Sequence, residues 1–94
     1  MKSDLNFDYP LLSGWTTQDI IQVSQLYSLV AQANEAQVSR IELLTAYQAF
    51  KQVVPTKSEE KQLDRQFKVS SGYSIYKTMQ AAQASTATKF SVTQ

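Results

Sequence analysis

The sequence predicts an all-α domain, a compact bundle of four helices that follows an extended N-terminal lead-in. Two glycines and two prolines in 94 residues leave few breaks, which favours long helices over the many turns of a β-sandwich. Hydrophobic residues make up 43% and charged residues 18% of the chain, a balance typical of a globular core. Capping signals then divide the chain into helices over residues 16–34, 39–54, 56–71 and 74–84.

The lead-in covers residues 1–15, where Pro10 disfavours helical structure in the residue before it. The first helix begins at Thr16, whose hydroxyl can cap it, with Asp19 at the third helical position as the reciprocal partner. Its apolar residues cover a broad arc, which indicates contact with more than one neighbour. Ile21 is the exception, because it falls among the polar residues of this helix.

The second helix has the clearest start, since Ser39 and Glu42 have the spacing of a capping box. Pro55 ends it, because proline lacks the backbone donor and clashes with the preceding turn. Thr56 and Glu59 repeat the capping-box spacing and begin the third helix. The connection is so short that we expect the second and third helices to be the tightest pair.

The third helix has a thin apolar stripe, mainly Leu63 and Phe67. Gly72 is suited to the left-handed conformation that terminates helices, and Ser74 can cap the fourth. We therefore predict a single domain over residues 1–84. The Ser/Thr-rich segment 85–94 is expected to form a flexible C-terminal tail.

The composition argues against catalysis and metal binding. The chain has no histidine and no cysteine, which removes the commonest general base, the commonest transition-metal ligand and any thiol nucleophile. Capping or solvation accounts for the carboxylates of Glu59, Glu60 and Asp64, and capping accounts for the hydroxyl of Ser74. We expect no catalytic, cofactor or metal site, and hence no enzyme. Lacking a long apolar run or an apolar signal core, the chain is expected in the cytoplasm, without membrane contact.

Four cations share one stripe of the third helix, because Lys57, Lys61, Arg65 and Lys68 fall within about 80° at helical spacing. Such a stripe is a candidate anion surface for RNA backbone, a phosphorylated ligand or an acidic partner. The alternative is an ordinary solvated face, in which Asp64 pairs with Lys68. The net charge of only +1 favours the solvated face.

A second candidate surface consists of Ile21, Tyr73 and Tyr76, because tyrosine suits interfaces and an apolar residue on a polar face needs a contact. The first hypothesis is a non-enzymatic protein-interaction module with an unknown protein partner or weak self-association. The alternative is an RNA- or phosphate-associated accessory protein that uses the basic stripe, with nucleic acid the less favoured partner.

Several segments resemble a known family. They are residues 54–63 (VPTKSEEKQL), residues 71–76 (SGYSIY), residues 47–51 (YQAFK), and the pair of residues 9–11 with residues 15–17. Together they resemble uncharacterised protein family 0223, small proteins of Gram-positive bacteria of the Bacillus and Lactobacillus group. The likeness covers roughly residues 7–82. It implies a compact helical fold, but it brings no activity, ligand or functional residue.

Overall fold

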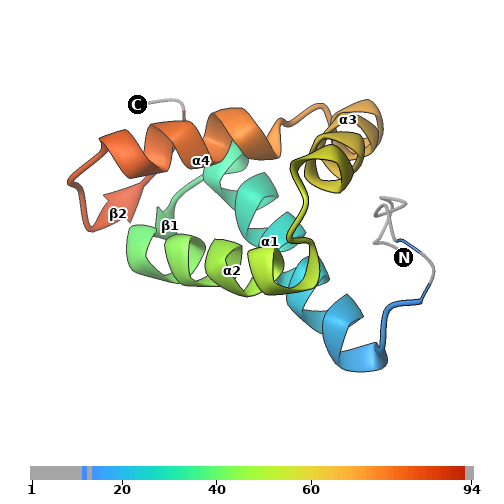
Figure 1. The fold of residues 1–94 in the computed structure, drawn as a ribbon. Coiled ribbons are helices and arrows are strands. Elements are labelled where there is room, and N and C mark those ends of the chain that lie inside the picture. Colours follow the sequence, from blue (N-terminus) through green and yellow to red (C-terminus); the bar gives the residue numbers. More distant parts are fainter. Residues whose placement is uncertain (1–11, 13, 93–94) are drawn as a thin grey trace, which may run out of the picture.

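The computed structural model describes residues 12 and 14–92, and it confirms an all-helical bundle (Figure 1). Most of the predicted lead-in, residues 1–11 and 13, lies outside the described part. The elements in chain order are α1 (Thr17–Glu35), β1 (Val38–Ser39), α2 (Arg40–Val53), α3 (Lys57–Ser71), α4 (Ile75–Ala84) and β2 (Lys89–Phe90). Among the described helices, none is both long and apolar enough to span a bilayer.

All four helices begin at the predicted caps, since Thr16, Ser39, Thr56 and Ser74 each accept a hydrogen bond from the backbone three residues later. At Thr16 the capping box is reciprocal, with both hydrogen bonds at 3.0 Å. These bonds satisfy amide donors that have no partner within the first turn of a helix. The four helix starts are therefore fixed by local sequence.

The helices α2 and α4 run side by side in opposite directions, and α1 crosses both (Figure 1). The most extensive packing joins α1 to α2, whereas α3 lies chiefly against α4. The expectation that α2 and α3 are the tightest pair is therefore wrong. The turn through Pro55 is short, but it directs α3 away from α2. Helices that are adjacent in the sequence are therefore not the most extensively packed pair here.

The core gathers around α1, which contributes six of its buried residues, among them Leu26 and Tyr27. The helix α3 contributes only the two predicted residues, Leu63 and Phe67. The ring of Phe67 stacks on that of Tyr27, with centroids 4.8 Å apart and planes at 15°. At the end of α3, Gly72 has a φ of +86°, the left-handed conformation predicted for it.

The C-terminal segment corrects the prediction of a flexible tail. Its strand β2 pairs antiparallel with β1, with Val38 opposite Phe90. The side chain of Phe90 is buried, and the Val92 amide donates to the carbonyl of Ala33 at 2.9 Å. The domain therefore continues past residue 84, because apolar residues that are isolated along the sequence reach the core through long-range strand pairing.

Candidate electropositive groove

An open groove of ≈ 780 Å³ lies where α3 faces the end of α2 and the start of α4. The whole predicted basic stripe lines it. Its other lining residues come from all three helices. The full set is Tyr47 and Lys51 of α2, then Lys57, Glu60, Lys61, Asp64, Arg65 and Lys68 of α3, then Ser74, Ile75, Tyr76 and Lys77 around the start of α4.

The groove is strongly cationic by composition. Six of the nine cations of the chain line it, but only two of the eight carboxylates do so. Sequence reasoning found the four cations of α3 and missed Lys51 and Lys77. Those two belong to other helices, and only the tertiary packing brings them to the stripe. Their positions in the sequence could have indicated this, because both lie near the turns that join α3 to its neighbours. Lys51 lies one turn before Pro55, and Lys77 lies in the first turn after the Ser74 cap.

One carboxylate of the groove, Glu60, is held by α2. Its two oxygens accept from the Tyr47 hydroxyl and from the Lys51 ammonium, each at 2.5 Å. Burial, and then the hydrogen bond and negative charge of Glu60, raise the pKa of Tyr47 above its ordinary value. This cluster ties α2 to α3 along one side of the groove. It also neutralises the charge of Lys51.

The other carboxylate, Asp64, is held by the start of α4. Its Oδ1 accepts from the Ile75 amide at 2.6 Å, and its Oδ2 accepts from the Ser74 hydroxyl at 3.3 Å and the Tyr76 amide at 3.4 Å. The expected pairing of Asp64 with Lys68 is therefore not made. A helix N-terminus with unpaired amides holds this carboxylate through hydrogen bonds and the helix dipole.

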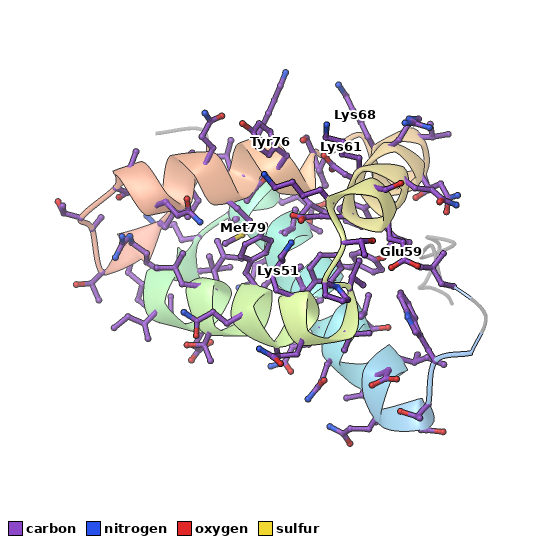
Figure 2. All side chains as sticks on the ribbon, viewed as in Figure 1. Lys51, Glu59, Lys61, Lys68, Tyr76 and Met79 are labelled. Carbon is purple, nitrogen blue, oxygen red and sulfur yellow. The ribbon has the colours of Figure 1, made fainter. Side chains whose placement is uncertain are left out.

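The cations of the stripe consequently keep their charge exposed. In the part of the chain that the structure describes, the only ion pair within 4.0 Å is Lys51–Glu60. Lys57, Lys61, Arg65 and Lys68 are all exposed, and Figure 2 shows Lys61, Lys68 and Tyr76 along the edge formed by α3 and the start of α4. The groove therefore presents unneutralised positive charge beside an aromatic ring.

The three residues of the predicted partner surface do not form one patch. The hydroxyl of Tyr73 donates to Glu35 at the end of α1, at 2.7 Å, and this hydrogen bond raises the pKa of Tyr73. Ile21 is 53% exposed, but it lies nearly four helical turns before Glu35 on α1, which corresponds to about 20 Å along the helix axis. Only Tyr76, which is 62% exposed, belongs to the groove.

The described residues contain no group of three or more metal-ligating side chains placed to hold an ion. The same carboxylates that were considered for a cation, Glu60 and Asp64, accept from protein donors instead. The groups that the described groove presents are its exposed cations and the ring of Tyr76.

Comparison with known proteins decides the family. The sequence model of an uncharacterised protein family, UPF0223, matches residues 6–91. The chain belongs to UPF0223. A UPF0223 protein of Lactiplantibacillus plantarum is 47% identical over 95% of this chain and 92% of its own length. Relatives of this family in Oceanobacillus iheyensis (46%) and Streptococcus thermophilus (48%) each cover 84% of the chain, and 90% and 85% of their own lengths.

The match confirms the predicted family and carries it further along the chain than expected. The UPF0223 pattern runs to residue 91, beyond the predicted domain end at 84. It thus includes β2, whose pairing with β1 belongs to the fold. The family is uncharacterised, so the groove has to be interpreted from its own geometry.

Proposed function

We propose that this UPF0223 protein is a non-enzymatic binding module whose groove accepts an acidic segment of a partner protein. One observation carries the proposal: six of the nine cations line a single groove, in a chain whose net charge is only +1. An uneven charge distribution of this kind focuses a positive potential on one face, where it speeds the approach of an anionic partner.

The two carboxylates in the groove support this interpretation. Glu60 and Asp64 accept hydrogen bonds from α2 and α4, so they hold the helices together at the groove. Exposed cations without an internal partner lose little when a ligand carboxylate approaches, because no existing ion pair has to be broken. Within the part of the chain that the structure describes, Lys57, Lys61, Arg65 and Lys68 are in this position.

The charge on the rest of the chain favours a protein partner over nucleic acid. With the groove residues set aside, three cations and six carboxylates remain, a net negative charge. Nucleic-acid-binding domains usually carry a basic excess, because a long polyphosphate also feels the charge around its site. A short acidic segment of a protein needs contact only with the groove itself.

The proposal of a module without catalysis rests on the side chains that are present. The chain lacks histidine and cysteine, and the Ser74 hydroxyl in the groove is occupied, since it accepts from the Lys77 amide at 3.1 Å and donates to Asp64. A serine nucleophile needs a neighbouring base to accept its proton, whereas this hydroxyl contacts a capping carboxylate.

The test uses the full chain with two probes of equal charge, a fluorescein-labelled peptide of ten alternating Glu and Asp residues and a labelled ten-phosphate oligo(U). We expect the peptide to bind more tightly in low salt, with an affinity that falls as NaCl rises. Replacing Lys57, Lys61, Arg65 and Lys68 together by Gln should lower the affinity about fourfold or more, from summed contributions of about 0.2–1 kcal/mol each.

The matched control changes one charge at a time. Lys61→Gln removes a groove cation, and Lys89→Gln removes an exposed cation of β2, at the opposite end of α4 from α3 (Figure 1). Only Lys61→Gln should lower the affinity for the acidic peptide. Equal effects of the two variants would show binding by overall charge, tighter binding of oligo(U) would show a nucleic-acid site, and binding of neither probe would remove any anion-binding role. Each of these results overturns the proposal.

A further inference from the structure

Tyr76 differs from the other tyrosines in the described part of the chain. Tyr47 and Tyr73 use their hydroxyls to bind Glu60 and Glu35, and Tyr27 is fully buried. Tyr76 is 62% exposed, and its hydroxyl makes no hydrogen bond within the described residues. Its ring therefore contributes little to the core, yet it lies at the groove.

The backbone of Tyr76 is held firmly although its side chain is exposed. It lies in the first turn of α4, whose start is capped by Ser74 and bound by Asp64 from α3. The preceding residue, Ile75, is buried in the core and anchors this turn. A rigidly presented tyrosine offers a large apolar area with few torsions to freeze, which is why aromatic residues dominate binding energy at interfaces.

In such a groove, charge and apolar contact would contribute to recognition in different ways. Exposed ion pairs are screened by salt and discriminate poorly between acidic sequences, because each is worth little and has loose geometry. Burial of an apolar side chain against a fixed ring depends on shape, and it changes little with salt. A groove with both elements selects acidic segments that also carry an apolar residue.

We infer that Tyr76 is the specificity-determining residue of the groove, and that its ligand is an acidic protein segment with an apolar side chain seated on the Tyr76 ring. This inference rests on the proposed function, because it needs an acidic segment in the groove. It adds the chemistry that distinguishes the partner from any other polyanion. The cations provide attraction, and the ring provides selection.

The experiment compares two labelled peptides of the same net charge, binding to the full chain. One consists of ten alternating Glu and Asp residues, and the other has two additional Leu residues at its centre. We expect the Leu-containing peptide to bind about three- to tenfold more tightly, by the area it buries. The ratio of the two affinities should stay constant as NaCl is raised, although both affinities fall.

Three variants then assign the preference to a residue. Tyr76→Ala should bring the ratio of affinities close to one. Lys61→Gln should weaken both peptides and leave the ratio unchanged. Ile21→Ala removes a similarly exposed apolar side chain on α1 that does not line the groove, and it should change neither affinity. Because Tyr76 and Ile21 are exposed, circular dichroism melts of both variants should match the parent.

The outcomes separate this inference from the proposed function. If both peptides bind the parent equally, or if Tyr76→Ala keeps the preference, Tyr76 does not select and the inference is overturned while the anionic groove stands. Loss of the preference in Ile21→Ala would place the apolar contact on α1 and would likewise overturn it. If neither peptide binds, the proposed function itself fails.

Discussion

Helices α1 and α3 have similar lengths but divide their surfaces in opposite ways. The helix α1 has buried residues along most of its length and packs against α2 and α4. The helix α3 buries only Leu63 and Phe67, and the rest of its surface is polar or charged apart from the exposed Val69. Most helical stability in proteins comes from a packed apolar face, and α1 has a broad one whereas α3 has only two buried apolar residues.

This contrast indicates where a surface function has room to exist. Residues packed in a core cannot be exchanged freely, since a change of one methylene is felt by their neighbours. The exposed residues of α3 are free of that constraint, and they carry a stripe of cations. The predictions below test the division between a structural α1 and a surface-oriented α3, from the largest expected effect to the smallest.

The largest effect is expected from Phe67→Ala, which removes one of the two anchors of α3 and its stacking on Tyr27. Truncation of a buried phenylalanine costs about 3–5 kcal/mol. Urea unfolding followed by circular dichroism gives the free energy, and hydrogen exchange gives its location. We expect amides of α3 to lose protection before those of α1.

The control for this change is Leu26→Ala on α1, which is expected to cost about 2–5 kcal/mol. Because α1 contacts the other helices, Leu26→Ala should lower protection throughout the domain. If Phe67→Ala and Leu26→Ala gave the same exchange pattern, α3 would be as integral as α1 and the contrast would disappear.

A second prediction concerns the C-terminal strand, which extends the structural half of the molecule. Phe90→Ala should lower the free energy of unfolding by about 3 kcal/mol, because the buried side chain joins β2 to the core. Thermal and urea unfolding measure the loss. Lys89→Gln, at the exposed neighbouring position, should stay within about 0.5 kcal/mol of the parent. A Phe90→Ala variant as stable as the parent would instead support the prediction of a flexible C-terminal tail.

The parts of the fold that sequence predicted are those fixed within a few residues. Thr16, Ser39, Thr56 and Ser74 cap their helices through bonds that span three positions, so the capping signals placed every helix start. Gly72 likewise needs only its own backbone conformation. The pairing of Val38 with Phe90 joins segments that are far apart in the sequence, and no local sequence pattern in residues 85–92 predicts it.

The candidate site divides in the same way. Helical periodicity placed Lys57, Lys61, Arg65 and Lys68 on one stripe, because they belong to one helix. Lys51 and Lys77 reach the groove only through the packing of α2 and α4 around α3. The orientation of Asp64 towards α4 instead of Lys68 depends on that packing too. Sequence therefore predicted a charged face, and the tertiary structure made it a groove.

A third prediction tests the joint between α3 and α4. Asp64→Asn keeps the size of the side chain but removes the charge that binds the Ile75 amide. We expect a loss of about 1–2 kcal/mol, as for a lost helix cap with a charged acceptor. The comparable change on α1, Asp19→Asn, affects only an exposed local cap and should cost less, about 0.5–1 kcal/mol.

The same variant relates stability to the groove. Because Asp64 lines the groove and Asp19 does not, Asp64→Asn should raise the affinity for the acidic peptide more than Asp19→Asn does, through local charge alone. Chemical shifts of the α4 amides would report a displacement of the start of α4 directly. Unchanged shifts in α4 would show that the Ser74 cap alone sets its position.

The smallest effect is expected at the contact between α2 and α3, where the Tyr47 hydroxyl donates to Glu60. Tyr47→Phe should cost about 0.5–1.5 kcal/mol of unfolding free energy at neutral pH, as for one hydrogen bond.

The same contact predicts a pH dependence. Folding raises the pKa of Tyr47, so the folded chain keeps this proton while the unfolded chain releases it above about pH 10. The stability due to Tyr47 is thus fully present below pH 10 and is lost as the pH rises further. The difference between the parent and Tyr47→Phe in urea unfolding should narrow from pH 8 to pH 11. A constant difference would show that Tyr47 has the same pKa in both states, and a widening one that folding lowers it; either result would contradict the prediction.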